Sequence, residues 1–183
     1  MVNKLMYKFF IVIFFCFLFS SCIWQLFYKS PKPQKFALYK SNNIGLKANS
    51  TLKTNGFYYY IVTDRDFPGE KFFRYYRFLN NGEIRITGDI TGVNPVEVYL
   101  TRKYAIDEDL DKSLYGYYNA SNNIVEMEYV KEEREFLHKN YFYKSIGNLS
   151  SNGDTLYVKE QIYLNRNQTE QLNRVCLFYQ FPK

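Results

Sequence analysis

Short runs of aromatic and β-branched residues, separated by turn residues, fill the chain after Gly56. Apolar and polar positions alternate in Ile84-Arg85-Ile86 and from Val125 to Tyr129. Such alternation is typical of strands with one face in a core and the other in water. The pattern predicts eight strands. They are Phe57 to Thr63, Lys71 to Leu79, Glu83 to Thr87, Leu114 to Tyr118, Ile124 to Val130, Phe136 to Ile146, Thr155 to Leu164 and Arg174 to Phe181.

Two Asn-Gly pairs indicate how neighbouring strands are joined. Asn81-Gly82 lies between the second and third runs, and Asn152-Gly153 precedes the seventh. A type I′ turn needs a positive φ at both central residues, which Asn-Gly tolerates. We therefore expect type I′ hairpins and antiparallel pairing at both places.

One segment between the strands has a helical signature. Asn94 is a suitable N-cap, Pro95 suits the first helical position, and Val96, Tyr99 and Leu100 follow at spacings of three and four. Alternation of Val96, Val98 and Leu100 also fits a strand. The Asn-Pro start favours a short helix.

The N-terminal residues have the pattern of an export signal. Lys4 and Lys8 precede an uninterrupted apolar run from Phe9 to Phe19. This run is shorter than the roughly 20 residues that a membrane-spanning helix needs. A cleaved signal is therefore favoured, with an uncleaved anchor from Phe9 to Tyr28 as the alternative.

Phe19-Ser20-Ser21-Cys22, at the end of this run, resembles the lipobox of bacterial lipoproteins. The resemblance implies that residues 1–21 are removed and that Cys22 becomes the lipidated N-terminus. It places the protein in the cell envelope, with membrane lipid as its partner through the anchor. Residues 22–50, which hold Pro31, Pro33 and several lysines, are expected to be a tether. The barrel domain is expected at 51–183.

Composition supports a packed domain, since 46% of the residues are hydrophobic and 20% aromatic. Closing eight antiparallel strands into a barrel removes exposed sheet edges. Five segments resemble the lipocalin-like lipoproteins of Gram-negative bacteria, although Tyr58 stands where true lipocalins have Trp. We therefore expect a mainly β fold, a single antiparallel eight-stranded lipocalin-like barrel with one short helix. The segments are Leu52, Gly56-Phe57-Tyr58-Tyr59, Phe78-Leu79-Asn80-Asn81-Gly82, Tyr115-Gly116-Tyr117-Tyr118 and Phe178-Tyr179-Gln180-Phe181.

The second predicted strand suggests a ligand site. Arg74, Tyr76 and Phe78 share one face. If this face points inward, Arg74 is a cation that needs a partner, such as the anionic head of a small amphiphile. We expect Tyr59 on the same wall. The alternative puts Phe73, Tyr75 and Leu79 inside a filled barrel that binds no ligand and has a structural or protein-binding role.

Other chemistry is not expected. His138 is the single histidine, no Gly-x-Ser-x-Gly elbow occurs, and a calcium loop starting at Asp107 fails at Lys112 and Tyr118. We therefore expect no enzyme activity, no cofactor and no metal. Lys71 to Phe78 mixes cations and aromatics as nucleic-acid platforms do, but an exported protein meets no nucleic acid.

Cys176 is the remaining cysteine once Cys16 leaves with the signal and Cys22 is acylated. No disulfide is then available within the chain. Cys176 is expected to be a small buried hydrophobic residue. The identity of any protein partner is left open.

Overall fold

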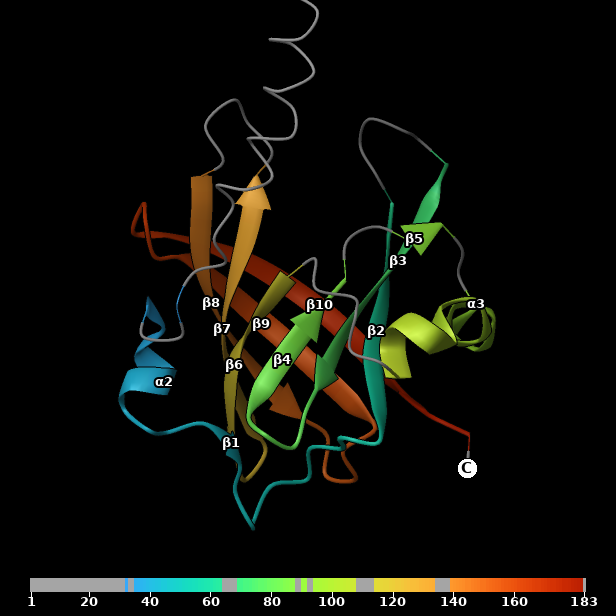
Figure 1. Cartoon of the computed structure of the whole chain (residues 1–183), viewed down its shortest axis with the longest axis horizontal. Helices are drawn as coiled ribbons and strands as arrows, with labels where there is room; N and C mark the ends of the chain where they lie inside the picture. Colours follow the sequence, from blue (N-terminus) through green and yellow to red (C-terminus); the bar gives the residue numbers. More distant parts are fainter. Residues whose placement is uncertain are drawn as a thin grey trace, which may run out of the picture. The chain divides into compact units, whose positions relative to one another are not determined.

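Eight antiparallel strands close on one another to form a barrel (Figure 1). Each strand pairs with the next strand of the ring, and β10 returns to pair with β2. The predicted mainly β, eight-stranded antiparallel barrel is confirmed. The ring contains β2 (Gly56–Thr63), β3 (Lys71–Phe78), β4 (Glu83–Ile86), β6 (Leu114–Ser121), β7 (Ile124–Glu133), β8 (Lys139–Leu149), β9 (Thr155–Tyr163) and β10 (Gln168–Gln180).

The structure is a computed structural model that describes residues 32, 35–63, 69–87, 90–91, 94–107, 114–133 and 139–182. Residues Pro33–Lys183 form one compact unit, which contains the barrel. The expected lipidation residue Cys22 and the histidine His138 lie outside the described residues. No helix in the described ranges combines the length and the apolar character needed to span a membrane.

Two short strands lengthen the sheet beside β4. β5 (Ile90–Thr91) pairs with β3 beyond Thr87, whose hydroxyl accepts a hydrogen bond from the Tyr75 N–H at 3.1 Å. At the other end of β4, β1 (Gly45–Leu46) pairs with β6 in parallel. The sheet therefore has ten strands, of which eight close the ring.

The two predicted Asn-Gly hairpins exist, but their turns are not type I′. Gly82 and Gly153 have φ values of 86° and 73°, whereas neither Asn81 nor Asn152 has a positive φ. In the first turn the Gly82 N–H donates to the Leu79 carbonyl at 3.0 Å, so the glycine alone takes the left-handed conformation. The loop between β3 and β4 is therefore longer than the two-residue loop of a type I′ hairpin.

The main core lies inside the ring. Its buried side chains come from all eight ring strands, and they alternate with outward residues, as the pleat of a strand requires. Val125, Met127 and Tyr129 point inward, as do Ile84 and Ile86, which confirms the predicted inner faces. Cys176 is also buried there as a free thiol.

Helix α3 (Pro95–Asp107) covers one part of the outer wall. The Asn94 side chain accepts a hydrogen bond from the Val96 N–H at 3.0 Å, which confirms the predicted N-cap and excludes the alternative strand. Val98 and Tyr99 pack on an outer aromatic cluster that β2, β3 and β10 contribute. The cluster contains Phe57, Tyr59, Phe73, Tyr75, Ile90, Val98, Tyr99, Tyr179 and Phe181.

A second part of the outer wall is covered by residues that we expected in the tether. The short helix α2 (Ala37–Lys40) packs beside β6 (Figure 1). Phe36 and Leu38 are buried against Tyr117 and Val130. Phe36 is only 1% exposed. The expected tether over 22–50 is therefore wrong for residues 35–50, because aromatic burial and the β1–β6 pairing hold them on the barrel. We call residues 35–50 the N-terminal strap.

Candidate ligand-binding site

One end of the barrel interior is closed by tyrosine hydroxyls. The Tyr58 hydroxyl donates to the Gly153 carbonyl at 2.8 Å and accepts from the Lys53 N–H at 3.0 Å. The Tyr118 hydroxyl donates to the Leu79 carbonyl at 2.9 Å. Burial raises the pKa of both tyrosines to about 12, so both hydroxyls keep their protons at neutral pH. These contacts tie Lys53 and the turns at Leu79 and Gly153 together across this end.

The interior contains a cation farther from that end. Arg174 of β10 lies opposite Val158 of β9, on the inward face that also carries Cys176. Its Nη1 donates to the Tyr76 hydroxyl at 2.5 Å, and its guanidinium lies 4.2 Å from the centre of the Tyr60 ring. Within the described part of the chain, no carboxylate contacts Arg174.

Neutral phenols surround this guanidinium. The Tyr129 hydroxyl donates to Gln161 Oε1 at 2.7 Å and lies 3.1 Å from the Ser145 hydroxyl. Burial raises the pKa of Tyr129 and of Tyr76 well above the usual value, so neither phenol ionises near neutral pH. The Arg174 site is therefore a positive charge among uncharged hydrogen-bonding groups.

The Arg174 guanidinium stays protonated at neutral pH. Burial by itself lowers the pKa of a guanidinium, but the phenol oxygens of Tyr76, Tyr60 and Tyr129 outweigh this effect and raise it above the usual value. Ionised groups out of water need hydrogen bonds and an opposite charge. Arg174 has the hydrogen bond and a ring, but its described neighbours offer no opposite charge.

The predicted site residues of β3 face the interior. Tyr76 and Phe78 are buried in the core, and Arg74 lies on the same face, opposite Tyr60 of β2. Arg74 has an interaction partner of its own, so it is not a bare cation. Phe78 packs on Tyr118 and Tyr58 at the closed end, which leaves it no free surface for a ligand.

Tyr59 does not share this wall. It pairs with Tyr75 across β2 and β3, whereas Tyr58 pairs with Tyr76. Because paired residues share a face, Tyr59 points outward, where it stacks on Phe73 at 5.0 Å between ring centres. The expected position of Tyr59 beside Arg74 is therefore wrong.

Sequence reasoning missed Arg174, although a signal was present. Leu172, Arg174, Cys176 and Phe178 alternate along one strand face, and three of the four are apolar. A cation inside an apolar stripe marks a buried charge that needs a partner. Treating Arg174 as the first residue of the strand hid this stripe, because β10 begins at Gln168.

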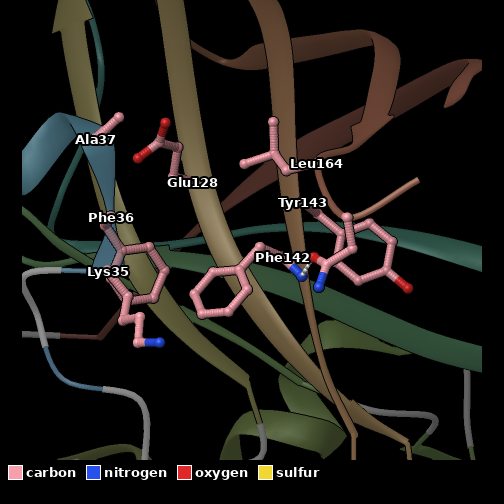
Figure 2. A pocket seen from close by; sticks show the side chains of 8 residues that line it. Lys35, Phe36, Ala37, Glu128, Phe142, Tyr143 and Leu164 are labelled. Atoms are coloured by element: carbon pink, nitrogen blue, oxygen red, sulfur yellow. Dashed lines mark hydrogen bonds between the residues drawn. The ribbon is translucent and has the colours of Figure 1, made fainter. Parts of the chain in front are cut away.

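A separate pocket lies on the outer wall, between the start of the strap and the β8–β9 region (Figure 2). Its volume is about 340 Å³. Phe36 and Phe142 form its aromatic side, and the Glu128 carboxylate lies above their rings in Figure 2. Asn165, which also lines the pocket, accepts a hydrogen bond at its Oδ1 from the Phe142 N–H at 2.8 Å, and this contact holds Asn165 against β8.

These features define the class of the protein as a closed up-and-down β-barrel with a guanidinium group in its interior. Comparison of the chain with protein-family models, with curated proteins and with solved structures gives no match. Among the described side chains, no group of three or more His, Cys, Asp or Glu residues could hold a metal ion.

Proposed function

We propose that this chain is a lipid-anchored protein of the bacterial cell envelope, whose lipocalin-like barrel binds a small amphiphile with an anionic head. The observation that carries the proposal is Arg174, a cation in the barrel interior that no described carboxylate contacts. A guanidinium suits a carboxylate or phosphate, since its parallel N–H groups can donate two hydrogen bonds at once.

The surroundings of Arg174 fit the apolar part of such a ligand. Val62, Leu172 and Tyr163 are partly buried side chains that pack against the core away from the closed end. Ligand sites combine apolar walls with a few polar groups that orient the ligand. Without residues 1–21, which hold Lys4 and Lys8 and no acidic residue, 22 basic and 18 acidic residues leave a net charge of +4, which also attracts anions to the protein.

The N-terminal anchor supplies the second half of the proposal. Cys22 is the lipidated residue of the lipobox-like sequence, and Phe36 is the first aromatic residue buried on the barrel. The two positions are fourteen residues apart in the sequence. A chain of this length spans at most about 50 Å when fully extended. A lipid on Cys22 would therefore keep the barrel near the membrane surface, where amphiphiles are concentrated.

We propose binding rather than catalysis. Tyr76 and Tyr129 have pKa values raised by burial, and Arg174 stays protonated. General bases work best when their pKa lies near the working pH. The phenols and the guanidinium of this site therefore suit recognition of an anion better than proton transfer.

A filled barrel with a structural role is the second candidate. Tyr58, Phe78, Met127 and Leu156 are fully buried, so the interior around them has no room for a ligand. Eight-stranded barrels can be filled by their own side chains. A ligand can therefore lie only on the Arg174 side of these residues.

One experiment separates the two candidates. The full chain is purified from membranes in mild detergent, and its retained small molecules are extracted and identified by mass spectrometry. We expect an anionic amphiphile to copurify with the parent chain and to be lost from Arg174→Met. Arg166→Met is the matched control, because Arg166 also stacks on a tyrosine, Tyr141, at 5.1 Å. Absence of such a molecule from all three proteins supports the filled barrel.

A further inference from the structure

The outer pocket of Figure 2 contains a buried carboxylate. Glu128 is 4% exposed, and its Oε2 accepts a hydrogen bond from the Leu38 N–H at 2.8 Å. In the described part of the chain, no lysine or arginine forms an ion pair with it. Glu128 is therefore an anion removed from water with one backbone partner.

Such a charge is costly to bury without an opposite charge. The Leu38 N–H, in the short helix α2, donates a hydrogen bond to this carboxylate. This contact offsets part of the cost and involves one of the two carboxylate oxygens. Glu128 lines the pocket beside the aromatic rings, so a ligand in the pocket would lie next to its carboxylate.

Aromatic rings complete the pocket. The Phe36 and Phe142 rings lie 5.5 Å apart between centres at 65°, so they form two adjoining walls. Leu164 lines the side opposite Ala37. Aromatic faces attract cations, most strongly when the cation is weakly hydrated, as alkylammonium ions are.

We infer that this pocket binds a small organic ammonium ion, with Glu128 as its counter-ion and the Phe36 and Phe142 rings as its walls. A volume of about 340 Å³ admits an ammonium group with a compact apolar body. The site is distinct from the barrel interior, because Glu128 lies on the outward face of β7 while Met127 and Tyr129 point inward. It does not depend on the proposed amphiphile site.

Calorimetric titration of the full chain in a non-ionic detergent tests the inference. Choline serves as the cationic ligand, and 3,3-dimethylbutan-1-ol serves as its uncharged isostere. We expect saturable binding of choline and at least about tenfold weaker binding of the alcohol, because only choline offers a charge to Glu128 and the rings. Equal binding of the two compounds, or no binding of choline, overturns the inference.

Substitutions locate the site. Glu128→Gln keeps an acceptor for the Leu38 N–H but removes the charge, and we expect at least about tenfold weaker binding of choline. Glu126→Gln is the matched control, because Glu126 shares this strand face and already pairs with Lys144 Nζ at 2.5 Å. Binding that is unchanged in Glu128→Gln contradicts the inference.

Two further variants keep the test decisive if Glu128→Gln fails to fold. Phe142→Leu preserves apolar volume but removes a ring, and should weaken choline binding several-fold. Lys35→Met removes a positive charge that lines the pocket and repels choline, so choline binding should become about two- to threefold stronger. No change in either variant places choline elsewhere and overturns the inference.

The ammonium group can belong to a free amine or to a lipid headgroup. A water-soluble short-chain phosphatidylcholine, titrated below its micelle concentration, separates these sources. Binding tighter than that of choline, and lost in Glu128→Gln, identifies the lipid headgroup. Weaker binding than that of choline identifies the free amine. Both outcomes support the ammonium site, whereas lipid binding that survives Glu128→Gln contradicts it.

Discussion

Tyrosine hydroxyls make the polar contacts of the barrel interior. Tyr58 and Tyr118 close one end, while Tyr76 and Tyr129 surround Arg174. Each ring fills apolar space, and each hydroxyl reaches a partner, which buried phenols generally need. The interior tyrosines are thereby joined by uncharged hydrogen bonds, and Arg174 adds a cation that no described carboxylate contacts.

Buried phenols predict a loss of stability at high pH. The pKa of Tyr58 and of Tyr118 is about 12 in the folded protein, and those of Tyr76 and Tyr129 are raised as well. Above pH 10 the unfolded chain loses these protons while the folded chain keeps them. The free energy of unfolding should therefore fall by about 1.4 kcal/mol per pH unit for each such tyrosine.

Denaturant titrations of the full chain between pH 9 and about pH 12, followed by tyrosinate absorbance, measure this slope. Tyr118→Phe should make the fall less steep. Tyr157→Phe is the control, because Tyr157 is exposed on the outer wall. A slope equal in the parent chain and in Tyr118→Phe would contradict the explanation.

At the scale of single elements, the turns decide how the barrel closes. The φ of Gly153 is 73°, and a Cβ at this position would lie 2.1 Å from the Thr51 carbonyl oxygen. Gly69 has a φ of 97°, but a Cβ there would meet no atom of the described residues within 4 Å. The two glycines share a left-handed conformation and differ in crowding.

Alanine at these two glycines separates the two effects. Gly69→Ala should cost about 1–2 kcal/mol, which is the strain of a left-handed residue with a Cβ. Gly153→Ala should cost clearly more, because the backbone at Thr51 must move away from the turn. Urea unfolding of both variants measures the difference, and equal losses would show that the backbone at Thr51 moves without cost.

The strap makes a second prediction at this scale. Phe36 is 1% exposed and packs edge-on against Tyr117 and Phe142. Phe36→Ala should lower the free energy of unfolding by about 3–5 kcal/mol, as expected for a buried aromatic residue. Tyr39→Ala, at a neighbouring residue that is 38% exposed, should cost much less. Similar losses in both variants would contradict the packing of the strap.

Periodicity revealed the strands because each inner face is apolar over several residues. The positions of the two Asn-Gly hairpins and of the Asn94 N-cap were predictable as well, because the local residue types decide those features. Arg74, Tyr76 and Phe78 were correctly grouped on one face. Whether Tyr59 joined them depended on the register between β2 and β3, which one strand alone does not reveal.

The sequence did not reveal that α3 and the N-terminal strap cover the outer wall of the barrel. Phe57, Phe73 and Tyr75 are buried on the outward face because α3 lies over them, so β2 and β3 have two apolar faces and no clear alternation. The strap was hidden by its lysines and by its lack of a repeating pattern. The two-residue β1 is too short to show any period.

For the whole molecule, the proposed anchor makes the first prediction. Cys22→Ser removes the thiol that a lipid would modify, so the chain should leave the membrane fraction or remain unprocessed. Fractionation and the mass of the N-terminal peptide measure both outcomes. Membrane association of the variant at full length would favour the uncleaved anchor over the lipid.

Truncation tests where the folded unit begins. A chain that starts at Pro33 retains the strap, whereas a chain that starts at Ser50 loses the burial of Phe36 and Leu38. Burying a large apolar side chain contributes about 1.5–3 kcal/mol, so the shorter chain should be about 3–6 kcal/mol less stable. Thermal unfolding of both chains gives the comparison. Equal stability would show that the strap contributes nothing.

The position of the strap also decides how the protein responds to a pulling force. Tension applied through the N-terminus reaches α2 and the two-residue β1 before it reaches any ring strand. Peeling residues 36–50 away releases about 50 Å of extended chain. The ring of eight strands stays paired while the length of free chain between the N-terminus and the barrel increases. Under load the strap therefore detaches before the barrel unfolds.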